Sequence, residues 1–160
     1  MITVIVPTLN SARRLPVCLA ALVPAAVDAI VGEVILADGG STDATLEIAE
    51  EAGARIVTGG LAAAVASARG DWLLHLLPTT RLEPDWAPQA MLHMQSRPDE
   101  AAWFRFALED SSLTARLTEV MRRLAPPRPD QGRLVRAGQG MAGRGRGLTA
   151  RAFNDPDAGR

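Results

Sequence analysis

The stretch formed by residues 33–51, EVILADGGSTDATLEIAEE, most constrains what this chain can fold into. It predicts a short buried strand at residues 34–36, an acidic turn at residues 38–41 and then a helix. Ser41 is expected to cap that helix, because its hydroxyl can accept from a free backbone N–H. A buried strand that leads through a Gly-rich turn into a helix is where an open α/β sheet presents its ligand crevice. Asp38 places an acceptor carboxylate at the mouth of that crevice.

The same alternation of strand and helix continues along the chain. Apolar runs predict further strands at residues 2–6, 55–57 and 72–77, and the connecting segments 15–22 and 61–69 favour helices. This βαβαβαβ order indicates an α/β fold with a mostly parallel sheet and right-handed crossovers. Later segments predict a helix at 84–97, a strand at 101–108 that could run antiparallel, an amphipathic helix at 113–124 and a last short strand at 133–136.

The C-terminal part differs from the rest in composition. Residues 138–160 are rich in Gly and Arg and predict a mobile tail after a single domain at residues 1–137. Residues 113–160 hold ten arginines and four acidic residues, whereas residues 1–60 hold three arginines and seven acidic residues. This basic part could contact phosphates or an anionic membrane surface, or could simply be a solvated surface. The net charge of −1 argues against nucleic acid as a partner.

The sequence also bounds the compartment. All seventeen basic residues are Arg, which is typical of a GC-rich genome, and we expect a bacterial origin. The single cysteine, Cys18, excludes an internal disulfide, and its spacing with Leu15, Leu19 and Leu22 predicts a core residue. No basic segment precedes the first apolar run, and no apolar run reaches about 20 residues, so neither a signal peptide nor a transmembrane helix is expected. These features together predict a cytoplasmic protein.

Five fragments in order carry a resemblance to a known family. They are VIVPTLN (4–10), EVILADGGSTDAT (33–45), ARGDWLLHL (68–76), TRLEPDW (80–86) and PDQGRLVR (129–136). Together they resemble family 2 glycosyltransferases of the GT-A fold, and most closely the short bacterial subfamily of selenodomain-associated transferases. The resemblance implies transfer of a sugar from a UDP- or GDP-linked donor to an acceptor that the sequence does not identify.

The resemblance also implies where the nucleotide binds. It places the loop after the first strand, with Pro7, Thr8 and Asn10, against the nucleoside. It places the turn of Asp38, Gly39 and Ser41 at the base, where the Asp38 carboxylate can accept the N3–H of uracil or a guanine edge. The alternative is that residues 38–41 form a plain strand-to-helix turn.

Three departures from the family pattern bear on the chemistry. Relatives carry an Asp-X-Asp or His-Ala-Asp element after the fourth strand, which holds Mg²⁺ or Mn²⁺ against the diphosphate. Here that position reads Leu77-Pro78-Thr79-Thr80, so no metal site is predicted, because hard cations need carboxylate oxygens. Thr79 and Thr80 could still donate hydrogen bonds to a phosphate.

The other two departures concern the donor loop and the catalytic base. Residues 58–68 are apolar where relatives have a Gly/Arg/Gln-rich loop, and the Glu-Asp pair that supplies the general base is missing after residue 136. Asp130 is the candidate that remains, although it matches a position near the acceptor rather than the base. The sequence therefore leaves three hypotheses open: a glycosyltransferase, a degenerate GT-A domain that binds a nucleotide or protein partner without chemistry, and a purely structural or interaction module.

Overall fold

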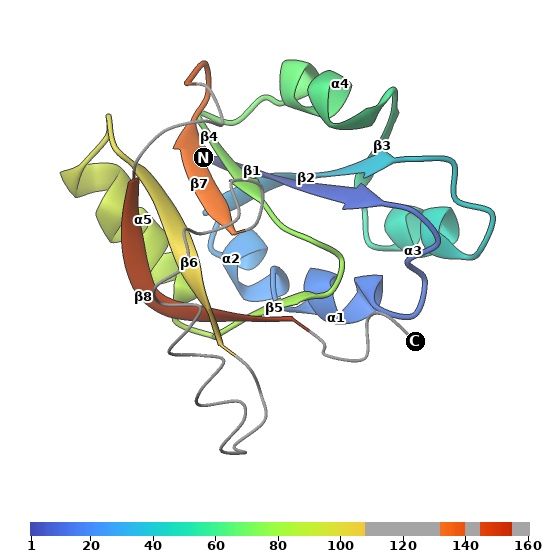
Figure 1. The fold of residues 1–160 in the computed structure, drawn as a ribbon, viewed down its shortest axis with the longest axis horizontal. Helices are drawn as coiled ribbons and strands as arrows, with labels where there is room; N and C mark the ends of the chain where they lie inside the picture. The colour runs from blue at the N-terminus through green and yellow to red at the C-terminus, as the bar shows by residue number, and fades with distance from the viewer. Residues whose placement is uncertain (108–131, 140–144, 155–160) are drawn as a thin grey trace.

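A mixed sheet with helices on both faces forms the body of the protein (Figure 1). The computed structural model describes residues 1–107, 132–139 and 145–154. The strands in this part of the chain are β1 (Ile2–Thr8), β2 (Val31–Asp38), β3 (Arg55–Thr58), β4 (Trp72–His75), β5 (Thr80–Leu82), β6 (Ala101–Ala107), β7 (Arg133–Arg136) and β8 (Gly145–Asn154). The helices there are α1 (Leu15–Ala20), α2 (Val23–Val27), α3 (Thr45–Glu51), α4 (Gly60–Ser67) and α5 (Trp86–Ser96).

One half of the sheet is parallel, as the sequence predicts. Its strands lie in the order β3-β2-β1-β4, and each neighbouring pair is parallel. The β-branched run of β1 is buried on both faces, which is why it reads as a continuous apolar segment rather than an alternating one. Because these strands point the same way, their carboxyl ends meet at one edge of the sheet.

The other half of the sheet is mixed, in the order β4-β7-β6-β8-β5. β7 is antiparallel to both β4 and β6, so β6 runs in the direction of the parallel strands. The expectation that β6 is antiparallel to the rest is therefore wrong. The reversed strands among those described are β7 and β5, because β8 is parallel to β6 and β5 is antiparallel to β8. β5 has only three residues and pairs antiparallel with β8, and the sequence analysis did not predict it.

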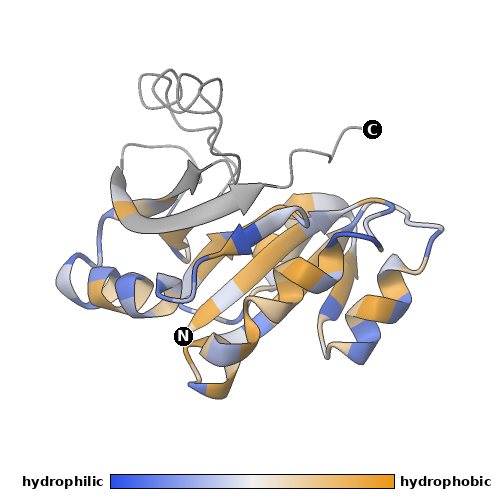
Figure 2. Cartoon of the chain, turned by 90° about the horizontal axis from the view of Figure 1, so that it is seen from below, coloured by the Kyte–Doolittle hydropathy of each residue, from blue (hydrophilic) through white to orange (hydrophobic). Residues whose placement is uncertain are grey.

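Two apolar clusters pack on opposite faces of the sheet. The larger one joins the alternate residues Val4, Val6 and Leu74 to helices α1, α2, α3 and α5. The smaller one joins Ile5 and Ile35 to α4. Figure 2 shows the central strands as apolar along most of their length, which fits this double burial. The cluster on the α1 side also buries Cys18, at 1% exposure, so the prediction that it is a core residue is confirmed.

Two local predictions about helices are wrong. The sequence predicts one helix over residues 15–22, but α1 ends at Ala20. A separate helix, α2, follows it with Pro24 in its first turn. Proline suits the first turn of a helix because the backbone N–H groups there have no acceptor within the helix, so the N–H that proline lacks is not needed. Ser41 does not cap α3. That helix begins at Thr45, and its N-cap residue is Ala44, which makes no side-chain capping hydrogen bond.

The Gly- and Arg-rich C-terminal part also departs from expectation. The composition of residues 138–160 predicts a mobile tail outside the folded domain, whereas residues 145–154 form β8 between β6 and β5. Strand pairing uses backbone groups, so a composition typical of loops did not prevent it. Leu148 of β8 joins the larger apolar cluster. The helix predicted at 113–124 and Asp130 lie outside the described residues.

None of the helices within the described residues is long and apolar enough to cross a membrane.

Candidate functional site

The candidate nucleotide site is built where β1 and β2 end side by side. The parallel register pairs Thr8, the last residue of β1, with Asp38, the last residue of β2. The ladder extends one step further, because the Gly39 N–H donates to the carbonyl oxygen of Thr8 at 2.8 Å. The strand pairing therefore brings together two site residues that are thirty positions apart in the sequence.

The Asp38 carboxylate is held by four donors. Its Oδ1 accepts from the hydroxyls of Thr8 (3.2 Å) and Ser41 (2.5 Å). Its Oδ2 accepts from the backbone N–H groups of Gly40 (2.8 Å) and Ser41 (2.9 Å). The side chain is buried, with 6% of the residue exposed. A carboxylate with two donors on each oxygen is oriented and close to saturated as an acceptor.

These contacts also determine the protonation of Asp38. Burial opposes ionisation and raises the pKa, but the hydrogen bonds from Ser41, Gly40 and Thr8 act the other way and together hold the pKa below its ordinary value. Asp38 is therefore an anion at neutral pH.

The two loops that follow β1 and β2 are joined by hydrogen bonds. The Asn10 N–H donates to Ser41 Oγ at 3.0 Å, and Asn10 Oδ1 accepts from the Thr42 N–H at 2.9 Å. Asn10 adopts a left-handed backbone (φ 47°), which asparagine tolerates better than most residues. Further along, the Ser11 N–H donates to Thr45 Oγ1 at 2.7 Å. These contacts turn the β1 and β2 loops into one unit.

Asp43 adds to this unit through both of its carboxylate oxygens. One carboxylate oxygen accepts from the Ala12 N–H at 3.1 Å, and the other accepts from the N–H and hydroxyl of Thr45. The hydrogen bond from the Thr45 side chain is the main cause that holds the pKa of Asp43 below its ordinary value. Asp43 and Thr45 thus organise the start of α3 in place of Ser41. The Asp-X-Thr spacing was the sequence signal for this turn.

The structure therefore brings together the residues predicted at the nucleoside. Thr8 and Asp38 are the last residues of β1 and β2, and Asn10, Gly39 and Ser41 lie in the two joined loops that follow. Pro7 lies one residue earlier in β1, opposite Ala37 of β2.

The segment after β4 reaches the same edge of the sheet, because β4 is the other neighbour of β1. Here the two threonines differ. Thr80 is 1% exposed, its Oγ1 accepts from the Leu77 N–H at 3.3 Å, and its own N–H donates to the Leu77 carbonyl at 2.9 Å. It closes the turn into β5. Thr79 is half-buried and is the better placed of the two for contact with a ligand.

The residues after β4 do not fit a divalent cation. Residues 76–80 offer leucine, proline and threonine side chains but no carboxylate, and the Thr80 hydroxyl already serves the turn. Within residues 1–107, 132–139 and 145–154, no group of three or more His, Cys, Asp or Glu side chains is placed to hold a metal. A magnesium- or manganese-type site needs hard oxygen ligands, usually carboxylates.

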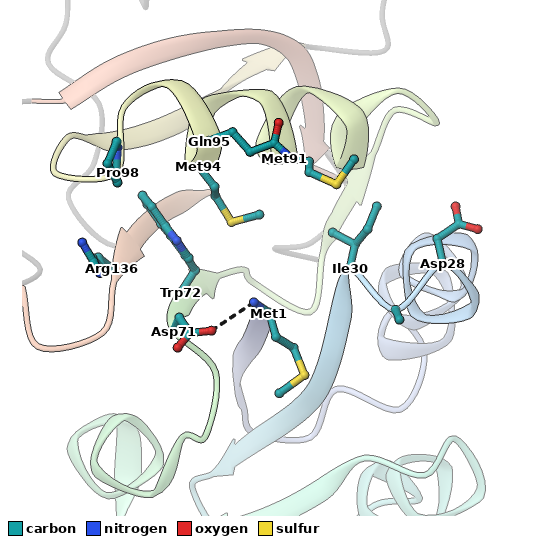
Figure 3. A pocket seen from close by; sticks show the side chains of 11 residues that line it. Met1, Asp28, Ile30, Asp71, Trp72, Met91, Met94, Gln95, Pro98 and Arg136 are labelled. Atoms are coloured by element: carbon teal, nitrogen blue, oxygen red, sulfur yellow. Dashed lines mark hydrogen bonds and ion pairs between the residues drawn. The ribbon is translucent and has the colours of Figure 1, made fainter.

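A separate pocket lies at the opposite edge of the sheet (Figure 3). Its volume is about 480 Å³, and its walls include Ile30, Trp72 and Met94. Ile30 directly precedes β2, and Asp38 is its last residue. Because β2 has eight residues and a strand rises about 3.3 Å per residue, Ile30 and Asp38 lie about 25 Å apart. The pocket therefore takes no part in the candidate nucleotide site.

Comparison with solved structures defines the class of fold. Glucosyl-3-phosphoglycerate synthase from Mycobacterium tuberculosis, in complex with Mn²⁺, UDP and glucosyl-3-phosphoglycerate, superposes with a TM-score of 0.61 at 21% identity, over 86% of this chain and 56% of that one. TarS 1–349 from S. aureus, in complex with UDP-GlcNAc, superposes with a TM-score of 0.58 at 18% identity, over 85% of this chain and 45% of that one. The fold is therefore the GT-A fold of glycosyltransferases, and the chain spans about half the length of these structures.

The family follows from the sequence. The family model described as "Glycosyl transferase family 2" matches residues 3–114, more than half of the chain, so the protein belongs to this family. The resemblance seen in the five fragments is confirmed at this level. No curated protein matches the chain.

Proposed function

We propose that this chain serves in the transfer of a sugar from a UDP- or GDP-linked donor, with the nucleoside bound at the strand ends and joined loops of residues 7–11 and 38–41. The observation that carries the proposal is the ionised Asp38 carboxylate, held with the Thr8 hydroxyl at the shared edge of β1 and β2. An anionic acceptor suits the N–H of a nucleobase. One of the two similar structures is a complex with UDP and the other a complex with UDP-GlcNAc, which supports a nucleotide-sugar donor.

Each residue of the loops has a role in this proposal. Asp38 accepts from the base, and Thr8 orients it. The Gly39 N–H donates to the Thr8 carbonyl oxygen at 2.8 Å and so holds the turn against the end of β1. Asn10 and Ser41 hold the two loops together. Thr79, from the segment after β4, lies on the diphosphate side. Pro7 directs the chain into the first loop.

A second candidate function is nucleotide binding without chemistry. The observation that favours it is the donor set after β4, which has no carboxylate to support a cation on the diphosphate. Asp130, the weak candidate for the base, remains a prediction for either function. Cytoplasmic location and a membrane-surface contact of the Arg-rich part also remain predictions.

Thermal unfolding with nucleotides tests the binding step. The melting temperature is measured with UDP, GDP, UDP-glucose and UDP-GlcNAc, each with and without Mn²⁺. A ligand at about 100 times its Kd stabilises the folded state by about 2.7 kcal/mol. The shift should be absent in Asp38→Ala and retained in Asp28→Ala, which removes an exposed carboxylate next to α2 at the far edge. Equal shifts in both variants would contradict nucleotide binding at Asp38.

Release of UDP separates the two candidate functions. The protein is incubated with UDP-glucose or UDP-GlcNAc and a panel of acceptors, and free UDP is measured with time. Turnover supports the glycosyltransferase, whereas a thermal shift without any turnover supports the binding domain. A thermal shift that requires Mn²⁺ would contradict the conclusion that the site does not fit a metal.

A further inference from the structure

The acceptor capacity of Asp38 is already used within the protein. Two hydroxyls donate to Oδ1 and two backbone N–H groups donate to Oδ2, at 2.5–3.2 Å. A carboxylate oxygen accepts about two hydrogen bonds of good geometry. A nucleobase N–H that binds Asp38 must therefore replace one of these four donors.

The four donors are not equally replaceable. The two N–H groups belong to the backbone of the turn and cannot leave without unfolding it. Thr8 lies within β1, is 4% exposed, and its backbone is paired with β2. Ser41 is half-buried on the turn itself, and its hydroxyl makes the shortest contact with Oδ1.

The Ser41 hydroxyl can exchange without opening the loops. Its oxygen accepts the Asn10 N–H at 3.0 Å while its proton is donated to Asp38. Rotation about the C–O bond moves only the proton, so the contact with Asn10 can persist when the proton turns away. The joined loops then stay in place for the ligand.

We propose that the Ser41 hydroxyl is a placeholder that occupies, in the free protein, the acceptor position on Asp38 Oδ1 that a nucleobase ring N–H takes on binding. The ligand class is a nucleotide whose base carries such an N–H, as uracil and guanine do. The inference rests on the proposed nucleotide site and adds that Ser41 competes with the ligand rather than recognising it.

Removal of a competitor should strengthen binding. Hydrogen bonds to a charged acceptor are about twice as strong as neutral ones, so loss of the Ser41 donor leaves an unsatisfied oxygen that the base can fill. Ser41→Ala should bind UDP or GDP about tenfold more tightly than the wild type, within the range of one charged hydrogen bond. The same variant should melt at a lower temperature without ligand, because its loops have lost two contacts. If Ser41 had only a structural role, its replacement by alanine would lower the affinity for the nucleotide and the stability of the protein together.

Thr42 offers a matched control in the next position. Its hydroxyl donates to Asn10 Oδ1 at 3.4 Å, so it also bridges the two loops, but it does not contact Asp38. Thr42→Ala should change the Kd by less than about twofold, as expected for a long and exposed hydrogen bond. Ser41→Thr, which restores a hydroxyl, should return the Kd to the wild-type value. Ser41→Cys, with a weak S–H donor, should also tighten binding and serves if Ser41→Ala does not fold.

Isothermal titration of the whole chain with UDP and with GDP gives the Kd of each variant. Tighter binding by Ser41→Ala or Ser41→Cys, with no such gain in Thr42→Ala, supports the placeholder. Weaker or unchanged binding by both Ser41 variants, with a wild type that binds, overturns this inference and leaves the proposed nucleotide site standing. A wild type that binds neither nucleotide overturns the proposed function and this inference with it.

Discussion

At the scale of the residue, Asp38 links the stability of the site to pH. Its pKa is lowered in the folded state, so its contribution is fully present above the unfolded value of about 3.9 and is lost as pH falls through the lower folded pKa. Asp38→Asn places an amide among four donors and should lower the free energy of unfolding by about 2 kcal/mol at pH 7. That difference from the wild type should shrink as the pH falls below about 3.9, because the protonated wild type also loses acceptor capacity.

Urea unfolding of both proteins from pH 7 down to the acid limit of the native state measures this difference. Glu33 and Asp43 also have lowered pKa values, so the wild type alone loses stability in acid for several reasons. The comparison with Asp38→Asn cancels those shared effects. Asp28→Asn, which changes an exposed carboxylate, should have nearly the wild-type stability at pH 7. A gap between wild type and Asp38→Asn that stays constant through the acid range would show that ionisation of Asp38 is not what holds the turn.

At the scale of the element, the entry into β4 depends on close backbone packing at Gly70. A Cβ on Gly70 would lie 2.7 Å from both the backbone nitrogen and the Oγ1 of Thr3, in the buried strand β1. Gly70→Ala should therefore cost about 1–3 kcal/mol, the range for overpacking. Gly32 in β2 is the control, because the three atoms nearest to a Cβ there all belong to the exposed and flexible side chain of Met1, which can move away. Chemical denaturation compares the two, and equal losses would show that β4 does not need this close approach.

Glu33 lies in the same strand as Asp38 but is not part of the candidate nucleotide site. Its Oε1 accepts from Arg55 Nε at 3.0 Å, and its Oε2 accepts from Thr3 Oγ1 at 3.2 Å and from the Arg69 N–H at 3.1 Å. This cluster ties the segment between α4 and β4 to the sheet. Glu33 and Asp38 both belong to β2, but only Asp38 lies at the carboxyl end, where the loops of a parallel sheet can meet a ligand.

At the scale of the whole molecule, the sequence predicts the parallel half of the fold better than the mixed half. Strands β1 and β4 and the second half of β2 carry continuous apolar runs, from which their burial can be predicted directly. β8 has a Gly- and Arg-rich sequence, and its pairing depends on distant strands. Asp38 could be found from its position after β2, but its bond from Thr8 depends on the register of β1 and β2. The wrong prediction for Ser41 has a similar cause. Its hydroxyl donates to Asp38 instead of capping α3, and this contact cannot be read from the sequence pattern.

The last consequence concerns whether β8 belongs to the folded body. Leu148 is 8% exposed and joins the larger apolar cluster, together with Phe104 of β6 and residues of α5. Leu148→Ala should lower the free energy of unfolding by about 2–4 kcal/mol, as for other buried leucines. In a chain of this size, each kcal/mol corresponds to about 2–4 °C in the melting temperature. Leu92→Ala removes a leucine of α5 that is 67% exposed and should change the melting temperature little. If Leu148→Ala were as mild as Leu92→Ala, the C-terminal residues would be a tail as the composition suggests, and the sheet would end at β6.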